Sequence, residues 1–141
     1  LAICTLGVAA KQLSGLVQQV RAGAEANGIS RLTALLGLED AIASRRRDYS
    51  EAGIAVTALG DDAPEVESKA ADLRYGEAKQ MYLNALDRLC WCILNGKLDE
   101  GELRSEYREV IRLAVEDHES DFGTGTKHRS VKKVYLRWAD T

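Results

Sequence analysis

Proline, aromatic residues and strand-like alternation are all scarce in this sequence. One proline and 6% aromatic residues occur among 141 residues, and runs of β-branched residues with period two are missing. Long stretches rich in Ala, Leu, Glu, Arg and Lys favour helix over sheet. We therefore predict an all-α fold, in which about five helices form a bundle built on a long antiparallel helical hairpin, as one domain over residues 1–141.

The chain also lacks a strong excess of charge and a cysteine framework. A net charge of −3 gives no global attraction to nucleic acid or to an anionic membrane. Three cysteines are an odd number, and Cys90 and Cys92 stand two residues apart on an expected helix. Their thiols then point in different directions and cannot chelate one ion. We expect free thiols in a cytoplasmic, reducing environment, and we expect no metal or other cofactor.

No charged residue precedes Lys11, so the chain begins with ten uncharged residues from Leu1 to Ala10. Ten residues cannot span a bilayer, which takes about 20. Two interpretations are open: the segment is the end of a membrane helix, or it is the first turns of a helix that faces the core. The first predicts further apolar residues before Leu1. Because Lys11 and Arg21 follow the apolar run, it also predicts a cytoplasmic domain anchored to the inner face of the bacterial membrane.

Stop signals and apolar periodicity indicate two helices in the first half of the chain. Asn27-Gly28 predicts that the first helix ends near Ala26, and Ser30 is a candidate N-cap for the second. A seven-residue pattern then predicts a coiled-coil-like seam on the second helix. The seam consists of Leu35, Leu38, Ile42, Arg45, Tyr49, Ala52, Val56 and Leu59.

A third helix follows Gly60-Asp61-Asp62, with Asp62 as the expected N-cap and Pro64 in the first turn. We expect Val66, Ala70 and Leu73 to form its buried stripe. The segment from Met81 to Leu94 is apolar almost all round a helical wheel, so we expect other helices to enclose it on every side.

Two more helices are expected in the last third of the chain. Gly96 can close the third helix in a left-handed conformation, and Asp99 is a candidate N-cap with Glu102 as its capping-box partner. Leu103, Tyr107, Val110, Ile111 and Ala114 are the predicted buried face of the fourth helix. A loop around Phe122 to Gly125 then leads to a short helix that carries Val131, Val134, Tyr135 and Trp138 at helical spacing.

Three segments carry a resemblance to known sequences: residues 82–90, the turn Gly96-Lys97-Leu98-Asp99, and Glu106-Tyr107-Arg108. Together they resemble a loosely defined set of uncharacterised bacterial helical proteins. Many of those have one N-terminal membrane helix ahead of a cytosolic helical domain. The resemblance extends over most of the chain and implies the same arrangement here, but it implies no activity.

The glycine loop and the basic helix after it are the candidate ligand-binding site. Gly123 and Gly125 precede a predicted helix whose N-terminus could hold a phosphate, although the Walker spacing is absent. Cationic residues follow, and such a face can bind nucleic acid, a nucleotide or anionic lipid, or can simply be solvated. The candidate residues are Gly123, Gly125, Thr126, Lys127, Arg129, Lys132 and Lys133.

Charges inside the apolar segment predict a structural ion-pair network. Asp87 and Arg88 are expensive to bury unless each is paired, and Arg108 is the expected third member. No nucleophile with a nearby base can be identified, so we expect no enzyme. We predict a helical interaction or regulatory module that self-associates or binds a protein partner through its seams. The alternative is a nucleotide- or nucleic-acid-sensing module, and we do not favour nucleic acid as a partner.

Overall fold

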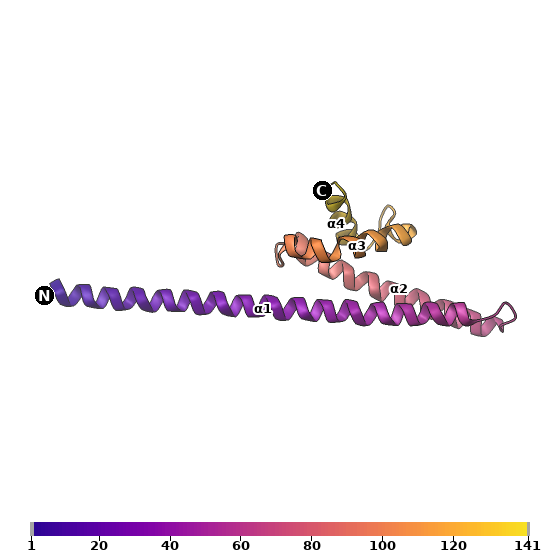
Figure 1. Ribbon diagram of the computed structural model, residues 1–141, viewed down its shortest axis with the longest axis horizontal. Helices are drawn as coiled ribbons and strands as arrows, with labels where there is room; N and C mark the ends of the chain where they lie inside the picture. Colours follow the sequence, from indigo (N-terminus) through magenta and orange to yellow (C-terminus); the bar gives the residue numbers. More distant parts are fainter. Residues whose placement is uncertain (1, 141) are drawn as a thin grey trace. The chain divides into compact units, whose positions relative to one another are not determined.

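Helices make up most of the structure, a computed structural model that describes residues 2–140, with side chains from residue 7 onward (Figure 1). The α-helices are α1 (Ala2–Ala58), α2 (Glu65–Leu94), α3 (Glu100–Asp117) and α4 (Arg129–Ala139), with a 3-10 helix, η1 (Glu119–Phe122), between the last two. Residues 2–140 contain no strand. The all-α prediction is therefore confirmed, with four α-helices where we expected about five.

The predicted break at Asn27-Gly28 is wrong, because α1 continues through it without interruption. Ser30 is therefore an interior helical residue and caps nothing. A glycine inside a helix costs only about 1 kcal/mol relative to alanine, and no proline follows that would force the chain to turn. The surrounding alanines and leucines are strong helix formers, so the helix ends only at Ala58, shortly before Gly60.

Contacts within the chain divide it into two units, residues 1–35 and residues 36–141. In the first unit α1 leaves its large apolar side chains in solvent: Leu13 is 65% exposed, Val20 71% and Ile29 66%. No helix in residues 2–140 is both long and apolar enough to cross a membrane. The predicted end of a membrane helix covers residues 1–10, and the side chains of residues 1–6 lie outside the described residues.

The second unit begins with the predicted hairpin, in which the C-terminal part of α1 runs beside α2 (Figure 1). Ile42 and Ala52 are buried along the predicted seam. The Tyr49 ring stacks on Tyr82, with centroids 5.9 Å apart, and lies 5.1 Å from the ring of Tyr75. Large tyrosines thus fill the space between the two helices, which confirms the seam.

The core of this unit forms where α3 and α4 pack on the second half of α2. Its members are at most 3% exposed: Leu83, Leu86, Leu89, Cys90, Ile93, Leu103, Ile111, Val131, Val134 and Trp138.

The expectation that Met81 to Leu94 is enclosed on every side is wrong, since Met81 is 43% exposed and Trp91 is 51% exposed. The buried stripe predicted earlier on α2 is also wrong. Val66, Ala70 and Leu73 are exposed, because α3 and α4 cover only the far half of the helix.

The start and end of α2 and the start of α3 follow the local signals at two of these three positions. Gly96 has φ +66° and closes α2 as predicted. The Asp99 side chain accepts a hydrogen bond from the Glu102 backbone N–H at 3.1 Å, which confirms the N-cap of α3. Asp62 does not cap α2, because extended Pro64 is the residue that precedes the helix, and its carbonyl accepts the first N–H bonds.

Candidate functional site

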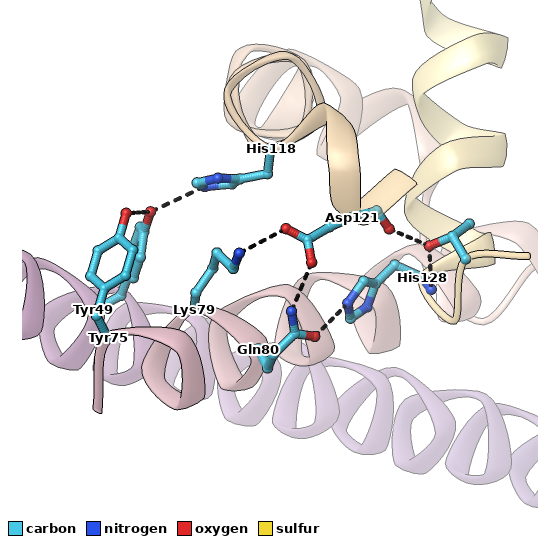
Figure 2. A network of polar contacts seen from close by, with 8 residues as sticks. Tyr49, Tyr75, Lys79, Gln80, His118, Asp121 and His128 are labelled. Atoms are coloured by element: carbon cyan, nitrogen blue, oxygen red, sulfur yellow. Dashed lines mark hydrogen bonds and ion pairs between the residues drawn. The ribbon is translucent and has the colours of Figure 1, made fainter. Parts of the chain in front are cut away.

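A cluster of polar side chains joins the loop of residues 118–128 to α2 (Figure 2). At its centre the Gln80 amide donates to the Asp121 carboxylate at 2.8 Å and pairs with His128 Nε2 at 3.1 Å. Lys79 adds an ion pair to Asp121, with 3.0 Å between nitrogen and oxygen. One turn of α2 therefore holds Asp121 and His128, which lie on either side of the glycine residues.

The orientation of Gln80 determines the proton arrangement on His128. Because the amide nitrogen donates to Asp121, the amide oxygen faces His128 and must accept from its Nε2–H. His128 is only 1% exposed, and this burial lowers its pKa. Burial opposes ionisation of Asp121 as well, but Lys79 and the Gln80 hydrogen bond outweigh it and lower the pKa of that carboxyl. The cluster thus pairs a neutral imidazole with an ionised carboxylate.

Thr126 closes the glycine loop on itself. Its hydroxyl donates to the Asp121 carbonyl at 2.6 Å and accepts from the His128 backbone N–H at 3.1 Å. Gly125, with φ +80°, supplies the left-handed turn just before it. These bonds use Thr126 inside the loop, so its hydroxyl is not directed at a ligand as a phosphate loop would require.

Asp87 caps the N-terminus of α4 from a distance in the sequence. Its Oδ1 accepts from the backbone N–H groups of Ser130 and Val131, at 2.9 and 3.1 Å. We expected Asp87 to pair with Arg88 and Arg108, but in residues 7–140 no ion pair joins these three side chains. Two N–H donors and the positive end of a helix stabilise the carboxylate in place of an arginine.

That cap also changes the interpretation of the candidate phosphate site. The helix N-terminus that could receive an anion already holds the Asp87 carboxylate. Lys127, Arg129 and Lys133 are exposed and Lys132 is half-buried. These four cations form no ion pair with a carboxylate in residues 7–140, so they remain a solvent-facing basic surface without a loop that closes over a ligand.

A second polar contact ties α1 to the rest of the unit. The hydroxyls of Tyr49 and Tyr75 lie 2.8 Å apart, and the Tyr49 hydroxyl lies 3.3 Å from His118 Nε2 (Figure 2). Burial and the neighbouring Tyr75 raise the pKa of Tyr49, and burial together with nearby Lys79 lowers the pKa of His118. Tyr49 and His118 are therefore neutral at pH 7, and hydrogen bonds join α1, α2 and the residue that follows α3.

A groove of about 510 Å³ lies along α1 beside α3 in the same unit. Ile42 and Ala43 from α1 and Tyr107 and Val110 from α3 supply its apolar lining. The Tyr107 hydroxyl donates to Glu39 at 3.4 Å, and burial together with that carboxylate raises the pKa of Tyr107 to about 12. Charged side chains of both signs line the rest of the groove.

Few of the described side chains are suited to catalysis or to metal binding. In residues 7–140 no group of three His, Cys, Asp or Glu side chains is placed to hold a metal ion. The Cys90 thiol is fully buried, and burial raises its pKa, which makes it a poor nucleophile. The polar groups of the cluster around Gln80 bond to one another, so the cluster stabilises the loop.

Sequence reasoning did not find Lys79, Gln80 or the three-way contact of Tyr49, Tyr75 and His118. A lysine and a glutamine on a helix carry no signal of their partners, which lie about forty residues later in the chain. The Thr126 turn had a usable signal, since a threonine two residues before a backbone N–H commonly forms such a turn.

No protein-family model, curated protein or solved structure matches this chain.

Proposed function

We propose that this chain is a non-enzymatic helical interaction module that self-associates through the N-terminal part of α1. The supporting observation is the exposure of large aliphatic side chains over residues 7–35. Leu13, Leu16, Val17 and Val20 recur at i, i+3, i+4 and i+7, and each is at least 45% exposed. A stripe with this spacing is the face that a helix buries against another helix.

A second apolar set lies on a different side of the same helix. Ile29 is 66% exposed and Leu32 is 56% exposed. Only four charged residues, Lys11, Arg21, Glu25 and Arg31, occur over residues 7–35. Exposed apolar surface of this extent marks an interaction site, and apolar residues on two sides favour cover by more than one helix. Copies of the same segment would supply that cover in a homo-oligomer.

Sedimentation velocity over a concentration series tests the proposal. We expect the parent to shift to larger species as concentration rises, and Leu16→Glu with Val20→Glu to remove the shift. Gln18→Glu with Gln19→Glu is the matched control, because it adds the same charge to the same turns at exposed polar positions. Circular dichroism should show that all three proteins stay helical. A parent that remains monomeric at every concentration would exclude self-association.

A further inference from the structure

The groove between α1 and α3 has an arrangement of charges that complements itself. Glu39 lies toward one end, and Arg46 and Arg47 lie two helical turns further along α1. Neither arginine forms an ion pair in residues 7–140, whereas neighbouring Arg45 pairs with Asp48 on its own helix. The groove therefore presents two carboxylates, Glu39 and Glu51, and two guanidinium groups without an ion pair along one helix.

The same face of α1 carries exposed apolar residues beyond both ends of the groove. Leu36 is 56% exposed and Ile54 is 69% exposed, and they stand eighteen residues, or five helical turns, apart. Ala43 lies between them and offers little side-chain bulk against an approaching helix. A small residue at the centre, flanked by charges and then by aliphatic residues, is suited to close contact with a second helix.

We propose that this groove receives α1 of a second copy of the chain in antiparallel orientation, with Ala43 opposite its counterpart. That register places Glu39 and Asp40 of each copy at the level of Arg46 and Arg47 of the other, twice by symmetry. A parallel arrangement in register would instead place the arginines of one copy beside those of the other, which like-charge repulsion opposes. Charge complementarity therefore selects both the occupant and its direction.

This inference rests on the proposed self-association and specifies a site for it in residues 36–141. The Tyr107 and Val110 side chains on α3 form the wall against which the incoming helix would pack. The Tyr107 hydroxyl already holds Glu39 on that side of the groove. Glu39, a proposed partner of the arginines of the other copy, is thus already held in position before the second copy binds.

Charge reversal with exchange tests the register directly. Arg46→Glu with Arg47→Glu, and separately Glu39→Arg with Asp40→Arg, should each weaken self-association at least about tenfold, because like charges then face each other. An equal mixture of the two variants should associate again, since one copy then carries only carboxylates and the other only arginines at the facing positions. Sedimentation velocity of each protein and of the mixture is the measurement. Arg74→Glu with Lys97→Glu, at exposed positions outside the groove, is the control of equal charge change for Arg46→Glu with Arg47→Glu.

The outcomes separate this inference from the function on which it rests. Restored association in the mixture supports the antiparallel register. If the charge variants associate like the parent while Leu16→Glu with Val20→Glu does not, the groove is not the interface. The exposed stripe around Leu16 and Val20 then remains the proposed interface. If the two charge variants do not associate either alone or when mixed, the antiparallel register is wrong. A parent that never associates overturns both proposals.

Discussion

Replacement of Asp87 by alanine should destabilise the second unit more than loss of an ordinary helix cap. The carboxylate accepts from two backbone N–H groups at the start of α4, at 2.9 and 3.1 Å. Loss of an N-cap side chain typically costs about 1 kcal/mol. Loss of a negative charge at a helix N-terminus adds about 0.3–1 kcal/mol, and a part-buried donor left without a partner adds a comparable amount.

The expected total is about 2 kcal/mol in the free energy of unfolding, which corresponds to a fall in melting temperature of about 10 °C for a unit of this size. Asp87→Asn separates the contributions, because its amide oxygen keeps an acceptor while the charge is lost. We expect it to cost about 0.5 kcal/mol. Urea denaturation followed by circular dichroism provides both values.

The control is Asp72→Ala, on the exposed surface of the same helix. It should change the stability by no more than about 0.5 kcal/mol. If Asp87→Ala were as stable as Asp72→Ala, the two hydrogen bonds to α4 would contribute nothing measurable, and the assignment of Asp87 as a cap would be wrong.

Four further predictions follow from the same structure and sequence. Asp99→Ala should cost about 1 kcal/mol in a thermal melt, since it removes a single exposed cap. Burial lowers the pKa of His118 and of His128, so the unfolded chain binds more protons than the folded chain as the pH falls. The urea concentration at the unfolding midpoint should therefore stay constant above about pH 6.5 and decrease as the pH drops toward about 5. A midpoint that does not change with pH would contradict this. Nucleic acid should bind weakly at physiological salt in fluorescence anisotropy, and tight binding lost on Lys132→Glu with Lys133→Glu would favour the nucleic-acid alternative. The membrane-anchor hypothesis predicts that the protein stays in the membrane fraction through a carbonate wash, and recovery in the soluble fraction would exclude that anchor.

Features encoded by neighbouring residues could be predicted from the sequence. Asp99 and Gly96 act through bonds and backbone angles within a few positions, and both behave as expected. The seam around Ile42 and Ala52 was also predictable, because helical periodicity alone shows which face is apolar. These signals were sufficient for the fold class, for the end of α2 and for the start of α3.

Features that depend on tertiary packing between helices could not be predicted from the sequence. Asn27-Gly28 resembles a stop signal, but the strength of the flanking helix formers decides whether the chain turns. Val66 and Leu73 have the spacing of a buried stripe, and they are exposed because α3 and α4 cover only the far half of α2. Asp87 was recognised as a charge in need of a partner, but its partner is a backbone that becomes helical only in the folded unit.

The cap that Asp87 provides has a consequence for the order of folding. An isolated helix of eleven residues is marginal in water, and α4 has no capping side chain of its own. Its first N–H groups find their acceptor 43 and 44 positions earlier in the chain, on α2. Formation of α4 therefore has to wait until α2 is helical and close by. During synthesis that order arises naturally, because the chain direction places α2 before α4, so the carboxylate that caps α4 is made before the helix itself.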